Sequence, residues 1–178
     1  MNLESIKEKI RQVPDFPKKG IQFLDITTGI KDADALQAMI DYLYNIYKDR
    51  KIDYVAGIES RGFIFGAPLA CRLNAGFIPI RKPNKLPAET IKESYELEYG
   101  TDTIEMHADA VKAGDRVVVI DDLLATGGTA CAACNLIKKT GAEVDSAAFI
   151  IELTPLKGAK RIEDAGVDVV SMLKYDID

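Results

Sequence analysis

The sequence predicts an α/β fold, with a mostly parallel central sheet flanked by helices. Short apolar runs alternate along the chain with stretches of helical periodicity, a pattern typical of a parallel sheet covered on both faces. The run from Val117 to Ile120 consists only of β-branched apolar residues, as expected of a buried strand. The 178 residues fit a single domain, 1–178, because no internal repeat, low-complexity segment or linker divides them.

The N-terminal part contains two stretches of helical periodicity. The first covers residues 5–11 and is followed by prolines and a glycine that break helices. The second covers residues 32–47, where apolar side chains recur every three or four residues. We expect a helix over each stretch.

Strands and helices then alternate to the end of the chain. β-Branched and aromatic runs predict the strands, and longer stretches with apolar or small residues at helical spacing predict the helices. In chain order we expect a strand at 54–58, a helix at 63–73, strands at 77–80 and 116–120, a helix at 128–140, a strand at 143–151, a helix at 159–165 and a strand at 168–173.

The stretch from about residue 82 to 109 departs from this pattern. It is polar and shows only broken alternation of apolar and polar residues. A long, weakly apolar excursion in a compact domain usually serves as a lid or an arm. We therefore predict a flexible flap over about 82–109 that closes over the site.

Composition narrows the possible partners. Hydrophobic residues make up 47% of the chain and the formal net charge is -5, which disfavours a general nucleic-acid binder. No apolar run approaches the length of a membrane span, and the charged N-terminus lacks a signal-peptide core. We expect a cytoplasmic protein with small-molecule substrates, without nucleic-acid or membrane partners.

Three cysteines give an odd count, which suits a reducing compartment. Cys131 and Cys134 form a C-x-x-C pattern, but they lie inside the expected helix at 128–140 among alanines. We favour close helix packing over a redox role for this pair. A zinc site would need a second ligand pair, which the sequence does not offer.

The most informative stretch follows the strand at 116–120, where two adjacent carboxylates and a glycine pair precede a helix. Glycines at a helix start let the backbone approach an anion and turn its N–H groups toward it. We predict a sugar-phosphate site, with ribose hydroxyls on the carboxylates and phosphate on the loop; the alternative is an ordinary strand-to-helix turn with two solvated acids. The expected contacts are Asp121, Asp122, Ala125, Thr126, Gly127, Gly128 and Thr129.

Further polar residues follow two other expected strands. In an open α/β sheet, ligands bind at the carboxyl ends of the strands, so these residues should meet the acid pair at one edge. Basic side chains are donors for phosphate oxygens, and four of them in a net acidic protein favour an anion site over ordinary surface charge. The four basic residues are Arg61, Arg81, Lys82 and Lys85, for which pyrophosphate is the natural anion; Glu59 and Ser60 precede Arg61 in the same loop.

Several of these segments resemble known sequences. The run from Val117 to Thr129 resembles the 5-phosphoribosyl-1-pyrophosphate (PRPP) signature of the type I phosphoribosyltransferases. The segments FLDITT, GIESRGF, RKPNKLP, LEYG and EMHADA stand in the order and spacing found in the adenine phosphoribosyltransferases. This resemblance covers nearly the whole chain and implies the type I phosphoribosyltransferase fold. It also implies the conversion of adenine and PRPP to AMP and diphosphate in purine salvage.

The resemblance also implies roles for single residues. Glu59, Ser60 and Arg61 would form the pyrophosphate loop, with a cis peptide bond at Glu59–Ser60. Arg61 and Glu98 would be catalytic, with Glu98 taking part in proton transfer. Phe23 would sandwich the base in a small N-terminal hood of about residues 1–30. Leu24, the other expected base contact, stands where many family members carry arginine.

Magnesium and a homodimer are implied in the same way. Mg2+ would be carried mainly by pyrophosphate and ribose hydroxyls near Asp121 and Asp122, without direct protein ligands. The arm at 82–109 would reach the neighbouring subunit, where Lys82 or Lys85 could complete the pyrophosphate site.

Two alternatives remain open at the level of sequence. The enzyme could act on hypoxanthine, guanine, xanthine or orotate, although the segments around Phe23 and Glu98 favour adenine. Instead of an enzyme, the chain could be a PRPP-sensing regulator, which would need a DNA-binding domain or a basic face.

Overall fold

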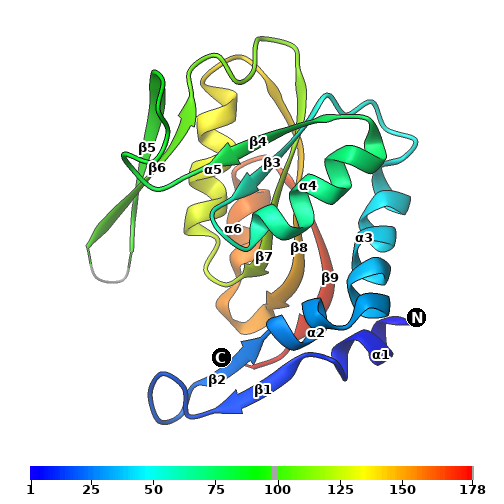
Figure 1. Cartoon of the computed structure of the whole chain (residues 1–178). Coiled ribbons are helices and arrows are strands. Elements are labelled where there is room, and N and C mark those ends of the chain that lie inside the picture. Colours follow the sequence, from blue (N-terminus) through cyan, green and yellow to red (C-terminus); the bar gives the residue numbers. More distant parts are fainter. Residues whose placement is uncertain (98–99, 178) are drawn as a thin grey trace.

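The computed structural model describes residues 1–97 and 100–177. Its centre is a five-stranded sheet with the strand order β4-β3-β7-β8-β9, and every pair of neighbouring strands runs parallel (Figure 1). The strands are β3 (Tyr54–Ile58), β4 (Gly76–Ile80), β7 (Arg116–Leu124), β8 (Glu143–Leu153) and β9 (Asp168–Tyr175). The predicted α/β fold with a mostly parallel sheet is confirmed.

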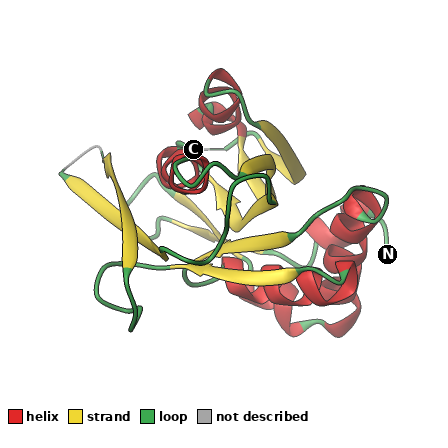
Figure 2. Ribbon diagram, turned by 90° about the horizontal axis from the view of Figure 1, so that it is seen from above, coloured by secondary structure: helices red, strands yellow, loops and turns green. Residues whose placement is uncertain are grey.

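Helices cover both faces of this sheet (Figure 2). The helices are α3 (Ala33–Tyr47), α4 (Gly62–Leu73), α5 (Gly128–Lys138) and α6 (Gly158–Asp164). Val118 and Ile120 pack in one hydrophobic cluster with residues of α3 and α4. Val117 and Val119 pack in a second cluster with residues of α5 and α6. Because successive strand residues point to opposite faces, a strand buried on both sides needs a continuous apolar run.

The order of the strands creates a switch point between β3 and β7. From β3 the chain continues through α4 to β4 on one side, and from β7 it continues through α5 to β8 on the other. Helices that leave neighbouring strands in opposite directions open a crevice at the carboxyl ends of those strands. The fold therefore brings the loops after β3 and β7 to the place where a ligand is expected.

Strand β7 extends beyond its predicted end at residue 120. Pairing with β3 stops at Gly57↔Ile120, but pairing with β8 continues through Asp121↔Phe149 to Leu124↔Glu152. The sequence-based boundary was wrong because one neighbour still offers hydrogen bonds to polar residues of the strand. Asp121 and Asp122 thus lie within a strand, past its last residue pair with β3.

The N-terminal segment differs from the prediction. The helix expected at 5–11 is α1 (Leu3–Lys7), and Arg11 already begins β1 (Arg11–Pro14), which pairs antiparallel with β2 (Gln22–Asp25). At Arg11, pairing with Asp25 of β2 overrides the helical periodicity of the preceding residues. A short helix, α2 (Thr27–Lys31), follows. Figure 1 places the β1–β2 hairpin below the edge at which β7 and β8 end.

The stretch expected to form a flap contains an antiparallel hairpin of β5 (Thr90–Glu96) and β6 (Thr101–His107). Tyr95, Ile104 and Met106 of this hairpin are buried in the second hydrophobic cluster, together with residues of α5. One face of the hairpin, from Met106 near its open end to Tyr95 next to its turn, therefore belongs to the core of the domain. Its closure over the site remains a prediction.

Candidate active site

The loop from Ala125 to Thr129 connects β7 to α5. Gly127 has a φ of +79° and α5 begins at Gly128. Among the described residues, no backbone carbonyl or side chain accepts a hydrogen bond from the N–H groups of residues 126–129. Free N–H groups at a helix start form a cradle for an anion. A pocket of about 100 Å³ lies at this loop, lined also by Asp121, Leu123 and Phe149.

The start of α6 holds the loop in place. A Cβ atom on Gly127 would lie 2.8 Å from the carbonyl oxygen of Gly158. Such a distance is too short for a carbon atom, and the neighbour is backbone that cannot rotate away. Glycine is thus required at position 127 both by its positive φ and by the contact with α6.

The two adjacent carboxylates have different partners. The side chain of Asp122 is 7% exposed and accepts a hydrogen bond from Nε of Arg61 at 2.5 Å. Asp121 Oδ1 accepts a hydrogen bond from the backbone N–H of Asp122 at 2.8 Å. Burial, together with the charge of Asp122, raises the pKa of Asp121. Asp122 is therefore held by Arg61, whereas Asp121 faces the pockets.

A second pocket, of about 150 Å³, lies between the ends of β3, β4 and β7. Asp121 and Thr129 line both this pocket and the one at the loop, so the two pockets are adjacent. The remaining lining residues are Ile58, Glu59, Ile80, Arg81, Lys82 and Ile104.

The cations predicted to bind pyrophosphate are paired with carboxylates of the chain itself. Glu59 accepts hydrogen bonds from Arg81 Nε at 3.2 Å, from the backbone N–H of Lys82 at 2.9 Å and from Lys85 Nζ at 2.5 Å. Burial would raise the pKa of Glu59, but these neighbours lower it below its usual range. Lys82 Nζ pairs with Asp102.

The negative charge of Glu59 gives it a different role from the cations around it. Through its hydrogen bonds, the Glu59 carboxylate orients the side chains of Arg81 and Lys85. Ser60 follows it and is exposed. The Glu59–Ser60 peptide bond is cis, as the resemblance implies.

On the base side of the site, the structure describes two of the predicted residues, Phe23 and Leu24. Phe23 is half-buried and meets Phe16 edge to face, with ring centroids 5.1 Å apart. Leu24 was predicted to contact the base, but its side chain is 7% exposed and lies in the core. Neighbouring residues of β2 point to opposite faces, so Leu24 can offer only its backbone where Phe23 offers its ring. Glu98 lies outside the described residues.

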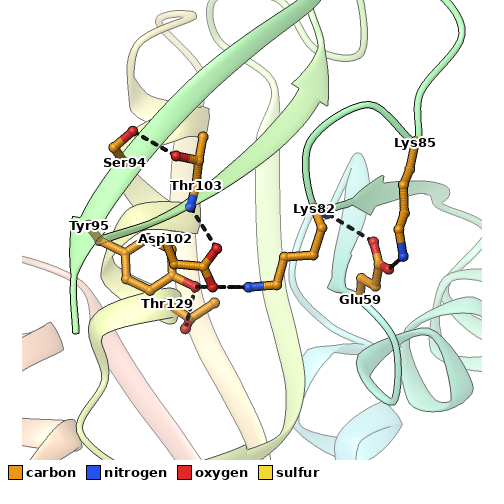
Figure 3. A network of polar contacts seen from close by, with 8 residues as sticks. All are labelled: Glu59, Lys82, Lys85, Ser94, Tyr95, Asp102, Thr103 and Thr129. Atoms are coloured by element: carbon orange, nitrogen blue, oxygen red, sulfur yellow. Dashed lines mark hydrogen bonds and ion pairs between the residues drawn. The ribbon is translucent and has the colours of Figure 1, made fainter. Parts of the chain in front are cut away.

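Sequence reasoning missed several residues around the pockets, among them Leu123, Tyr95 and Asp102. Leu123 is half-buried and lines the pocket at the phosphate loop. An apolar residue directly after the acid pair was the available signal. Tyr95 and Asp102 join Lys82 to Thr129 through hydrogen bonds (Figure 3). Nothing in the local pattern of the hairpin indicated this network.

The cysteine pair has the properties of packed thiols. Burial raises the pKa of Cys134 to about 12 and also raises the pKa of Cys131. A thiol with a raised pKa is a poor nucleophile at neutral pH. The preference for packing over redox chemistry therefore agrees with the structure.

In the described part of the chain, no three His, Cys, Asp or Glu side chains group closely enough to hold a metal ion by themselves. None of the helices in residues 1–97 and 100–177 is long and apolar enough to span a membrane.

The sheet, the glycine loop and the adjacent cationic pocket define a phosphoribosyl transferase domain. The family model of that description matches residues 28–176. Adenine phosphoribosyltransferase from Thermoanaerobacter sp. is 55% identical over 98% of this chain and 100% of its own length. Adenine phosphoribosyltransferase 3 from Arabidopsis thaliana is 58% identical, over 97% of this chain and 93% of its own.

A solved structure agrees with these sequence relatives. The crystal structure of adenine phosphoribosyltransferase from Thermoanaerobacter pseudethanolicus superposes with a TM-score of 0.92, at 55% identity, over 98% of this chain and 100% of that one. The chain belongs to the adenine phosphoribosyltransferase family, a family of pentosyltransferases.

Proposed function

We propose that this protein transfers the phosphoribosyl group of PRPP to adenine, giving AMP and diphosphate in purine salvage. The observation that carries the proposal is the adjacency of two anion pockets that share Asp121 and Thr129. PRPP carries a 5-phosphate and a pyrophosphate on one ribose. Two neighbouring pockets, one with free N–H groups and one with cations, match these two ends of a single molecule.

The loop at Ala125–Thr129 would bind the 5-phosphate through its backbone N–H groups. Asp121 opens on both pockets and is therefore placed to accept hydrogen bonds from the ribose hydroxyls. Asp122 would support it indirectly, by holding the Arg61 guanidinium. The ribose would then lie between the two anion sites.

The pyrophosphate would bind in the pocket of Arg81 and Lys82, with Arg61 and Lys85 at its edge. As pyrophosphate leaves C1 of the ribose, positive charge develops on the sugar and negative charge on the leaving group. Fixed cations beside the leaving group stabilise this transition state without reorganisation. In the single chain each of these cations forms an ion pair with a carboxylate, and these pairs would keep the cationic side chains in place until pyrophosphate binds.

The base would lie between Phe23 and the apolar side of the loop pocket, where Leu123 is half-buried. Glu98 is proposed for proton transfer from the attacking purine, on the strength of the resemblance. The flap at 82–109 would exclude water that could hydrolyse PRPP. Lys82 lies at the start of this segment, and its hairpin supplies the buried Tyr95, next to the turn.

Magnesium fits the carboxylates that are present. Asp121 lines both pockets, whereas Asp122 is occupied by Arg61, so Asp121 would be the nearest protein carboxylate to an ion carried by PRPP. When bound, Mg2+ would neutralise charge on the departing pyrophosphate. A cation beside Asp121 would also favour its ionised form.

A homodimer in the cytoplasm completes the proposal. Ile64 of α4, 38% exposed, lies next to Phe63, whose ring meets Phe77 of the edge strand β4. A second copy could cover this apolar surface. Since Lys82 lines the pocket of its own chain, the sharing of Lys82 or Lys85 between subunits rests on the resemblance alone. Sedimentation at micromolar concentration should give a dimer, and a fully active monomer would refute the shared site.

Pyrophosphate release tests the reaction directly. The purified protein is incubated with PRPP, Mg2+ and one base at a time: adenine, hypoxanthine, guanine, xanthine or orotate. Release should be fastest with adenine and should accompany AMP formation. Faster release with another base would overturn the choice of adenine, and release with none would favour the PRPP-sensing regulator.

A further inference from the structure

The phenol oxygen of Tyr95 lies between Thr129 and Lys82, which line the two anion pockets (Figure 3). It accepts a hydrogen bond from the Thr129 hydroxyl at 3.0 Å and donates one to Asp102 Oδ2 at 3.1 Å. Lys82 Nζ donates to the same phenol at 3.4 Å and pairs with Asp102. Thr129 belongs to the phosphate loop and lines both pockets, whereas Lys82 lines only the cationic pocket.

The direction of these hydrogen bonds limits what Thr129 can do. A threonine hydroxyl has one proton, and Tyr95 takes it in this arrangement. Tyr95 in turn gives its only proton to Asp102. A hydroxyl that has already donated its proton presents only lone pairs, which repel a phosphate oxygen. Thr129 can thus serve either Tyr95 or a phosphate, but not both.

Tyr95 is also held firmly by its surroundings. Its side chain is buried, in the same hydrophobic cluster as residues of α5 and β6. Asp102 is fixed by the backbone N–H of Thr103 at 2.8 Å. Burial lowers the pKa of Lys82, but its hydrogen bonds to Asp102 and Tyr95 outweigh burial and raise it. The ring and its two charged neighbours therefore form one hydrogen-bonded unit near the turn of the hairpin.

We propose that Tyr95 is a positioning residue that competes with the 5-phosphate for the proton of Thr129. While the loop is empty, the Thr129–Tyr95 hydrogen bond ties the β5–β6 hairpin to α5. When phosphate binds, Thr129 turns its proton to the phosphate and the hairpin loses this tie. Phosphate binding at the loop thereby releases the hairpin from α5, and this hairpin carries Asp102, the partner of Lys82. The inference rests on the proposed function, because it takes the loop as the 5-phosphate site.

The test uses the full chain and ribose 5-phosphate as the probe, with binding measured by calorimetry. Tyr95→Phe removes only the hydroxyl and leaves the buried ring in place. Phosphate then no longer has to displace a hydrogen bond, so the dissociation constant should fall about two- to tenfold. Loss of packing alone would not tighten binding.

A double-mutant cycle with Thr129→Val identifies the route of the effect. Thr129→Val should weaken binding, and adding Tyr95→Phe to it should change nothing more. Unchanged or weaker binding by Tyr95→Phe alone overturns the proposal. An equal tightening in the Thr129→Val background overturns it too, because the effect would then not pass through Thr129.

Tyr47→Phe is the matched control. It removes another buried phenol hydroxyl, hydrogen-bonded to Ser146 at 2.7 Å on the opposite face of the sheet. This variant should bind ribose 5-phosphate like the parent protein. Failure of the proposed reaction would be seen separately, as absent AMP formation by the parent protein, while the binding cycle would still report on Thr129 and Tyr95.

Discussion

Replacing Gly127 by alanine tests whether the phosphate loop depends on a glycine backbone. Gly127 has a φ of +79°, and an added Cβ would lie 2.8 Å from the carbonyl oxygen of Gly158. Gly114 offers a matched control, because its φ is +86° but nothing lies within 4 Å of an added Cβ. The two substitutions share the conformational strain and differ in the steric contact.

The structure sets the expected size of each effect. A non-glycine residue in the left-handed region costs about 1–2 kcal/mol, so Gly114→Ala should lower the melting temperature by about 2–8 °C. Gly127→Ala adds a forced shift of the α6 backbone, which costs about 1–3 kcal/mol more. Its melting temperature should therefore fall by about 4–20 °C.

Calorimetry and ribose 5-phosphate binding separate the two variants. Gly127→Ala should also weaken ribose 5-phosphate by at least about tenfold, the loss of one charge-assisted hydrogen bond from the loop. Gly114→Ala should leave that affinity unchanged. The reasoning is refuted if Gly127→Ala is no more destabilising than Gly114→Ala, or if both bind the ligand equally well.

Three further predictions concern the charged groups and the hairpin. Arg61→Ala should reduce kcat/KM for PRPP roughly 10- to 150-fold, which corresponds to a loss of about 1.5–3 kcal/mol of transition-state stabilisation, with little change in AMP affinity. Arg50→Ala is the control, because it removes an ion pair with Asp145 elsewhere in the chain. Equal losses for PRPP and AMP would contradict the assignment of Arg61 to pyrophosphate. Asp121 has a raised folded pKa, so its contribution to stability is present below its usual pKa and is lost as pH rises through the folded value. Asp121→Asn should therefore raise the free energy of unfolding at neutral pH, and this gain should shrink as the pH falls toward about 4. Denaturant titrations at several pH values measure the gain, and a difference that does not depend on pH would refute the prediction. Hydrogen exchange should be faster across 82–109 than in β7 and should slow when AMP and pyrophosphate are added; equal, ligand-independent protection would exclude a closing flap.

Much of the fold follows from local pattern. A strand buried on both faces needs an uninterrupted apolar run, so Val117 to Ile120 could be assigned without a structure. The N-terminal hairpin could not, because β1 exists only through pairing with β2, and its first residue, Arg11, still belongs to a stretch with helical periodicity. The end of β7 was misjudged for a similar reason, since its last hydrogen bonds come from β8.

The candidate site also has parts that local sequence predicts and parts that depend on the tertiary fold. Local sequence was sufficient to predict the loop with Gly127, because chain direction and a glycine pair before a helix already imply free N–H groups. Local sequence was not sufficient to place Leu24. The family resemblance predicted that Leu24 contacts the purine base, but in the fold its side chain lies in the core. A side chain's direction on a short strand depends on which face the rest of the domain covers.

By itself, the sequence determined the parallel α/β architecture, the family and the set of charged residues gathered at one edge of the sheet. Those features follow from periodicity, turn residues and the order of segments along the chain. Only the tertiary structure decided how the charges are paired: Arg61 with Asp122, Arg81 and Lys85 with Glu59, and Lys82 with Asp102. Pairing depends on distances between elements far apart in sequence, and Coulomb energy falls with those distances, so no local pattern encodes it.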